Sequence, residues 1–310
     1  MEAWQAHFQA LVMDLAAAVD DGLQEQFAAK VGWARDAFAA RGMETELLRA
    51  GLTELGAVLE ESLPGNAWAP LPEFFEAAGR ELERDPAIDE ARDAMDDPTG
   101  ELAKAYLAAV RGGEGKRAID GVLAAIGEGR LSIPDALDGV LMRALREIGR
   151  LWHTGVVGVA EEHFATQITG RLLEQIVLAA PTPDPYGRTV MLTMVEGDAH
   201  DLGLRIVAAF FELDGWRTIC LGANTPSADL LLSAQQFDAD LVVIGATLNI
   251  HRDGVARAIE MLGKSRPDQK ILVGGQGFSG LEQRAQEIGA HGCVLLARDA
   301  PRLGREIVEG

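Results

Sequence analysis

The chain has 310 residues, of which 48% are hydrophobic and 25% are charged, and its formal net charge is -20. The length is enough for two or three globular domains that each bury a core. The acidic balance argues against nucleic acid and anionic membranes as partners, because phosphate contacts need a basic surface. Since no apolar run is long enough to span a bilayer and the N-terminus lacks a basic signal region, we expect a cytoplasmic protein.

Residues 1–90 predict an N-terminal helical domain, either an up-and-down bundle or a small globin-like pack. Apolar residues recur at three- and four-residue spacing, and glycines and prolines separate the helical segments. We expect helices at residues 4–18, 23–40, 44–63 and 72–82. The acidic, proline-flanked residues 85–97 predict a linker or a short solvated helix.

Residues 98–180 predict a second helical domain, a bundle of four helices. Glycine-containing breaks interrupt the helical pattern at residues 112–113, 127–129 and 155–158. Three prolines between residues 181 and 185 exclude a helix there, so we interpret this segment as a linker.

Residues 187–310 predict an α/β domain with a doubly wound parallel sheet. Apolar, β-branched runs alternate with helical segments, which is typical of a buried parallel sheet. Five such units suggest the flavodoxin-like winding. We expect strands at residues 189–195, 218–221, 241–245, 271–273 and 293–296. Cys220 and Cys293 lie in these runs, so we expect them to be reduced core residues.

A D-x-H-x-x-G motif directly follows the first predicted strand. In an open α/β sheet, ligands bind at the carboxyl ends of the strands. A histidine there can ligate a metal, and a carboxylate two residues earlier can orient its other ring nitrogen. The glycine would let the backbone approach a bulky ligand. Taken alone, the motif is equally compatible with a solvent-exposed loop histidine. Its candidate binding residues are Asp198, Ala199, His200, Asp201 and Gly203.

The motif resembles the base-off cobalamin-binding motif, in which the histidine becomes the lower ligand of cobalt. The resemblance therefore implies that His200 is that ligand. Thr247 and Leu248 follow the third strand, and Gly274 and Gly275 follow the fourth. In cobalamin domains similar to that of methionine synthase, a small hydroxyl residue and a Gly-Gly pair at these places line the slot for the displaced nucleotide tail. The family's S-x-L reads Thr-Leu-Asn here, which keeps the hydroxyl and loses the leucine.

A second pattern, W-x9-E-H, is formed by Trp152, Glu162 and His163. It resembles the signature of adenosylcobalamin photoreceptors of the bacterial carotenoid-regulator type. The resemblance implies that the helical bundle caps the corrin, with Trp152 over the adenosyl group and Glu162 and His163 beside it. It also implies that His153 becomes an upper cobalt ligand after photolysis. Taken singly, Trp152 is equally a core residue, and Glu162 and His163 a solvated helix face.

The resemblance implies a light sensor rather than an enzyme. Light would break the cobalt–carbon bond, the adenosyl group would leave, and the cap would move relative to the sheet domain. The expected readout is a light-dependent change in homo-oligomer state or in binding to a protein partner. The family's N-terminal DNA reader has no counterpart here, because the first 97 residues are acidic and hold no basic recognition helix.

The N-terminal helices suggest a further chromophore, because the related photocobilins hold a bilin beside the cobalamin. Aromatic residues of this domain could wall biliverdin, with His7 as one contact; the alternative is that they are core residues. These aromatic residues are Trp4, Phe8, Phe27, Trp33, Phe38, Trp68, Phe74 and Phe75.

Two other functions stay open. A helical cap followed by a D-x-H-x-x-G domain is also the architecture of corrinoid shuttle proteins, the subunits that carry methyl groups in methyltransferase systems. Those proteins resemble the C-terminal part of this chain but generally lack the full W-x9-E-H pattern. A plain B12 store or carrier would bind cobalamin without responding to light.

Overall fold

The computed structural model describes residues 2–85 and 97–310, with side chains described from residue 9 onward. Most of the predicted linker at residues 85–97, and the side chains of Trp4, His7 and Phe8, therefore lie outside the described residues. The chain forms two compact units. The first contains residues 1–96 and 147–162, and the second contains residues 97–146 and 163–310. Among the described residues, no helix is both long and apolar enough to cross a membrane.

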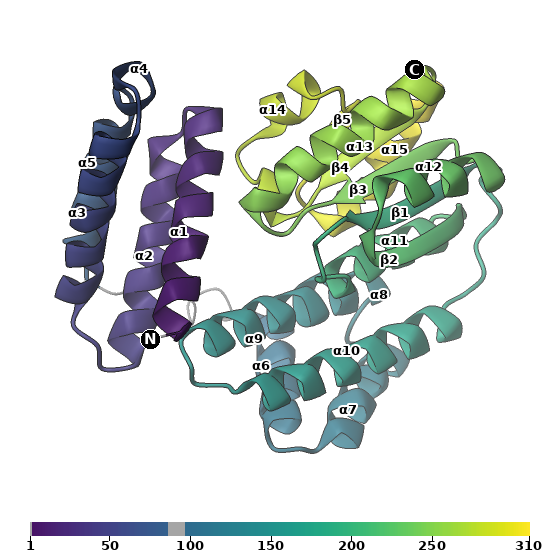
Figure 1. The fold of residues 1–310 in the computed structure, drawn as a ribbon. Helices are drawn as coiled ribbons and strands as arrows, with labels where there is room; N and C mark the ends of the chain where they lie inside the picture. The colour runs from purple at the N-terminus through teal and green to yellow at the C-terminus, as the bar shows by residue number, and fades with distance from the viewer. Residues whose placement is uncertain (1, 86–96) are drawn as a thin grey trace. The chain divides into compact units, whose positions relative to one another are not determined.

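The N-terminal helices of the first unit pack around an apolar core, as their periodicity predicts. They are α1 (Glu2–Asp21), α2 (Gln24–Ala40), α3 (Thr45–Ser62), the short α4 (Gly65–Trp68) and α5 (Leu71–Leu82) (Figure 1). Phe27, Phe38 and Phe74 are at most 3% exposed and lie within this core. Trp33, in contrast, is 47% exposed. Three of the aromatic residues considered as a chromophore wall are thus core residues.

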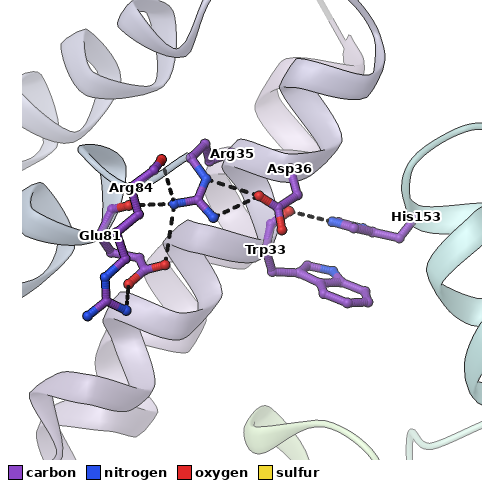
Figure 2. Close-up of polar contacts among 6 residues, drawn as sticks. All are labelled: Trp33, Arg35, Asp36, Glu81, Arg84 and His153. Atoms are coloured by element: carbon purple, nitrogen blue, oxygen red, sulfur yellow. Dashed lines mark hydrogen bonds and ion pairs between the residues drawn. The ribbon is translucent and has the colours of Figure 1, made fainter. Parts of the chain in front are cut away.

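Arg35 joins α2 to the C-terminal end of α5 (Figure 2). Its Nη1 donates to the carbonyl oxygens of Glu81, at 2.6 Å, and Arg84, at 3.1 Å. Carbonyls at a helix end lack partners within the helix, and a guanidinium there also complements the helix dipole. A Cβ on Gly32 would lie 2.7 Å from the Glu81 carboxylate, so α2 carries a glycine at this approach. The contacts of Arg35 therefore hold in place the segment of α2 that also carries Trp33.

The helical part of the second unit begins with α6 (Pro98–Arg111) and α7 (Gly115–Gly127). The predicted third helix is divided into α8 (Ile133–Asp135), the π-helical segment η2 (Ala136–Met142) and α9 (Arg143–His153). The fourth helix is α10 (Val159–Ala179), and α9 and α10 contribute residues to both units. The predicted breaks are confirmed, whereas nothing in the periodicity predicted the π-helical segment.

The C-terminal part of the second unit is a five-stranded parallel sheet of order β2-β1-β3-β4-β5, which confirms the flavodoxin-like winding. Alternate strand residues enter two cores on opposite faces. Met191, for example, packs with residues of α12 and α13, and Leu192 packs with residues of α11 and α15. The elements are β1 (Thr189–Val195), α11 (Leu202–Leu213), β2 (Arg217–Thr225), α12 (Ser227–Gln236), β3 (Leu241–Gly245), α13 (Arg252–Ser265), β4 (Lys270–Gly274), α14 (Glu282–Glu287), β5 (Gly292–Val294) and α15 (Ala300–Glu309).

Three predictions about this sheet are wrong in detail. The strand β2 extends to Thr225, because irregular register with β1 lets pairing continue beyond the predicted end at residue 221. Cys220 on this strand is exposed rather than a core residue, because β2 is an edge strand; Cys293 is partly buried, and both thiols are free. The strand β5 ends at Val294, so Leu295 and Leu296 follow it and are 45% and 50% exposed.

Candidate functional site

Asp198 lies at the point where the winding of the sheet reverses. The order β2-β1-β3 places the loops after β1 and β3 side by side at the carboxyl edge, where ligands bind in this fold. Gly197 has φ +90, a backbone conformation that glycine adopts without strain, and the next amide, of Asp198, donates to the carbonyl of Val195 at 3.0 Å. This turn buries the Asp198 side chain completely while the loop itself stays at the surface.

Asp198 and His200 form the pair that the D-x-H-x-x-G motif predicted. His200 Nδ1 lies 2.8 Å from Asp198 Oδ1, and the His200 amide donates to the same oxygen at 3.1 Å. The His200 side chain is 60% exposed, in contrast to its buried partner. A carboxylate bound at Nδ1 fixes the tautomer and leaves Nε2 as the nitrogen that can ligate a metal.

The second oxygen of Asp198 is held by the loop after β3. The Thr247 amide donates to Oδ2 at 2.6 Å, so the backbone of this loop, in addition to any role of its hydroxyl, contributes to the site. Burial tends to raise the pKa of Asp198, but hydrogen bonds from the His200 ring and from the Thr247 and His200 amides outweigh it and lower that pKa to about 2. The carboxylate is therefore ionised at neutral pH.

The remaining motif residues lie at the same edge but differ in their contacts. Ala199 is exposed, Asp201 precedes α11, and a Cβ on Gly203 would meet open space. A Cβ on Gly274 would lie 2.8 Å from the Val294 carbonyl oxygen, and one on Gly275 would lie 2.4 Å from that of Ala246. Packing within the protein thus already requires the glycine pair. Its role in a nucleotide-tail slot, and that of half-buried Leu248, stay predictions.

His251 is a site residue that the sequence reasoning missed. Its Nδ1 lies 3.2 Å from Asp198 Oδ2, and its side chain is 14% exposed. The available signal was its place four residues after Thr247, in the second loop that the winding brings to this edge.

The residues at this edge fit a cobalamin. A corrin would supply most of the cobalt ligands itself, so the protein would need to supply only one oriented imidazole, and the Asp198–His200 pair would provide it. A large, mostly apolar macrocycle also needs apolar surface. Ile250, Leu295 and Leu296, in the loops after β3 and β5, are 38%, 45% and 50% exposed.

The residues predicted above the corrin are divided between the two units. Trp152, His153 and Glu162 belong to the first unit, whereas His163 belongs to the second, together with His200. Trp152 lies in the last turn of α9 and is 49% exposed. Glu162 is partly exposed and His163 is exposed in the first turns of α10.

His153 contacts Trp33 of α2, as Figure 2 shows. The two rings are stacked with centroids 4.0 Å apart and an angle of 19° between planes. His153 Nε2 lies 2.7 Å from the Trp33 carbonyl oxygen, and because a carbonyl only accepts, the nitrogen donates. In this tautomer Nε2 carries its proton and is not available as a metal ligand.

Comparison with known proteins relates the chain to cobalamin-binding domains. Residues 102–176 and 188–303 each match a family model described as a B12 binding domain. A corrinoid protein of Desulfitobacterium hafniense is 28% identical over 184 residues, which are 57% of this chain and 84% of that protein. The HTH-type transcriptional repressor CarA of Myxococcus xanthus is 33% identical over 141 residues, which are 45% of this chain and 46% of that protein.

A solved structure supports the fold. The monomethylamine corrinoid protein of Methanosarcina barkeri aligns with a TM-score of 0.59 and 18% identity, over 67% of this chain and 98% of that protein. Its likeness concerns the fold alone. The two matched domains lead to one conclusion: the chain is a cobalamin-binding protein in which a helical B12 binding domain precedes a Rossmann-like one.

Proposed function

We propose that the protein holds cobalamin with His200 as the lower ligand of cobalt and uses the bound cofactor to sense light. The observation that carries the lower-ligand role is the 2.8 Å contact between His200 Nδ1 and buried, ionised Asp198. Asp198 orients the ring and makes its other nitrogen a more basic metal ligand, while the Thr247 amide holds the carboxylate in place. Adenosylcobalamin would supply a cobalt–carbon bond that visible light breaks.

The W-x9-E-H spacing supports the light-sensing part of the proposal. An adenosyl group is flat and has polar edges, so it needs an aromatic wall and hydrogen-bonding groups. Trp152 offers a half-exposed indole, and Glu162 and His163 offer the polar groups. In this proposal the chain has three domains, at residues 1–90, 98–180 and 187–310, and the middle domain caps the cobalamin.

The contact between His153 and Trp33 gives a signal a route to the N-terminal helices. If His153 is to ligate cobalt after photolysis, its Nε2 must leave the Trp33 carbonyl and lose its proton. The end of α9 would then separate from α2, which changes the surface available for self-association or for a partner. To shift the populations of the two arrangements from 1:99 to 99:1, photolysis must change their free-energy difference by about 5.5 kcal/mol.

Biliverdin would bind among the aromatic residues of the N-terminal helices. Phe27, Phe38 and Phe74 are already packed in the core, so a bilin would have to use the exposed indole of Trp33 or the partly buried rings of Trp68 and Phe75. We retain it as an outcome that the reconstitution experiment reports.

A second candidate is a corrinoid shuttle protein that carries a methyl group for a methyltransferase. The names of the relatives favour it over light sensing, because the Desulfitobacterium protein and the Methanosarcina structure are both described as corrinoid proteins. It needs the same His200 ligation. It gives no role to the contact between Trp33 and His153.

Reconstitution with adenosylcobalamin separates the two candidates. Absorbance spectra and molecular mass by light scattering are recorded in the dark and after green light, with and without biliverdin. The light sensor predicts a His-on spectrum that converts irreversibly, together with a change in mass, shape or partner affinity. A matched Trp152→Ala variant is expected to bind adenosylcobalamin more weakly than methylcobalamin. Photolysis without any change in size, shape or partner affinity, and a preference for methylcobalamin, would favour the shuttle.

A further inference from the structure

The side chain of His251 adds a second imidazole to the Asp198 carboxylate. Its Nδ1 lies 3.2 Å from Asp198 Oδ2, while His200 Nδ1 lies 2.8 Å from Oδ1. The side chain of His200 is 60% exposed and that of His251 is 14% exposed. Asp198 thus contacts one outward-facing and one largely buried ring, and only the outward-facing one belongs to the D-x-H-x-x-G motif.

The local structure fixes His251 in this position. It ends the 3-10 turn η3 (Asn249–His251), in which its amide donates to the Leu248 carbonyl at 3.1 Å. The next residue, Arg252, begins α13, and its Nη1 donates to the Gly277 carbonyl in the loop after β4 at 3.1 Å. His251 Nε2 would lie 3.7 Å from a Cβ on Gly197. The ring is therefore packed between the loop after β1 and the start of α13.

The chemistry of the ring nitrogen points to Asp198 as its partner. Among the described residues, Nδ1 of His251 is buried and makes no hydrogen bond of regular geometry. A buried polar atom without a partner is unfavourable, and the oxygen in contact with it is Asp198 Oδ2. The same oxygen already accepts from the Thr247 amide at 2.6 Å. A proton on His251 Nδ1 would make that nitrogen the second donor to this oxygen.

We propose that His251 is a positioning residue for the lower cobalt ligand. Together with the Thr247 amide it holds Oδ2 of Asp198, so that Oδ1 stays directed at His200 Nδ1 and His200 Nε2 keeps one orientation toward cobalt. This inference rests on the proposed role of His200. Removing a hydrogen-bond partner behind a metal ligand typically lowers metal affinity by about 10- to 100-fold. We expect an effect of this size.

The test uses full-length protein loaded with cobalamin and reduced to Co(II). Electron paramagnetic resonance then gives the fraction of cobalt with an axial nitrogen, and a spectral titration gives the Kd for cobalamin. His251→Ala removes the ring, and His251→Leu removes the donor while filling most of its volume. His251→Asn keeps an N–H near the place of Nδ1. His291→Asn is the matched control, because His291 lies in the same domain and its Nδ1 accepts from the Ile271 amide instead.

We expect His251→Ala and His251→Leu to lower the ratio of cobalt ligated by His200 (His-on) to cobalt without this ligand (His-off) by about 10- to 100-fold. His251→Asn should restore most of the ratio, and His291→Asn should leave it at the wild-type value. A wild-type ratio in the Ala and Leu variants would overturn the inference. The inference would also be overturned if all three His251 variants lowered this ratio equally and also lowered the Tm of the cofactor-free protein equally. Absence of axial nitrogen in the wild type itself would instead overturn the role of His200.

Discussion

The imidazole of His153 lies on the indole of Trp33, with 4.0 Å between ring centroids, and its Nε2 donates to the carbonyl oxygen of the same residue at 2.7 Å. One residue of α2 thus binds both the face and the edge of the ring. If this histidine ligates cobalt after photolysis, as the proposed light sensor requires, Trp33 would compete with the metal for Nε2.

Trp33→Ala is therefore expected to speed the appearance of His153-ligated cobalamin after illumination. The backbone carbonyl remains, but the stacking that aligns the ring is lost. A loss of about 1 kcal/mol corresponds to about a fivefold change in the equilibrium. The rate and extent of the spectral change after a light pulse measure how readily His153-ligated cobalamin forms. Trp68→Phe, in the same helical domain, is the control, and identical traces for Trp33→Ala and wild type would show that Trp33 does not hold His153.

Asp198→Asn is expected to weaken cobalamin binding through His200 by about 10- to 100-fold, because the neutral amide no longer accepts a charge-assisted hydrogen bond at His200 Nδ1. Spectral titration with cobalamin gives the Kd and the His-on fraction. Glu196→Gln removes an exposed carboxylate from the same loop and should change neither. An unchanged His-on fraction in Asp198→Asn would mean that His200 does not need its carboxylate.

Asp97 predicts a pH-dependent contribution to the stability of the helical region. The Thr99 hydroxyl, the Gly100 amide and Arg143 bind its carboxylate and hold the pKa of Asp97 well below its ordinary value. A carboxyl whose folded pKa is depressed stabilises the fold above its unfolded pKa and loses that effect as the pH falls through the folded value. Asp97→Ala should therefore lower Tm at pH 7, and the difference should shrink as the pH falls below about 4.

Thermal unfolding of the cofactor-free protein at pH 7, 5 and 3 checks this prediction. Asp120→Ala removes an exposed carboxylate that pairs with Lys116 on α7 and serves as the control. A Tm difference for Asp97→Ala that stays constant across this range would contradict the role of its charge.

Arg298 is expected to hold the π-helical segment to the loop after β5. Its Nε donates to Asp138 at 2.5 Å and its Nη2 lies 3.4 Å from Asp135. Arg298→Ala should increase hydrogen exchange in residues 133–142 severalfold, and high salt should reduce the difference, because a partly exposed ion pair contributes about 0–1 kcal/mol and is screened. Arg302→Ala, which breaks only a pair within α15, is the control. Equal exchange in both variants would argue against this link.

The sequence predicted the fold well where a single local signal decides it. Near-continuous apolar strands and prolines at residues 181–185 located the sheet domain, and the motif spacing located Asp198 and His200. The exposure of Cys220 was missed because strand order, and hence which strand is an edge, depends on distant pairing. His251 and Trp33 were missed as partners for the same reason, since each meets its partner only after loops or helices far apart in the chain have packed.

The most direct test of the central claim is electron paramagnetic resonance of Co(II) cobalamin bound to protein whose histidines carry nitrogen-15. Wild-type protein is predicted to show the two-line splitting of one axial nitrogen-15, and His200→Ala is predicted to lose it while the corrin signal remains. An unchanged splitting in His200→Ala, or its absence from the wild type, would contradict His200 as the lower ligand of cobalt.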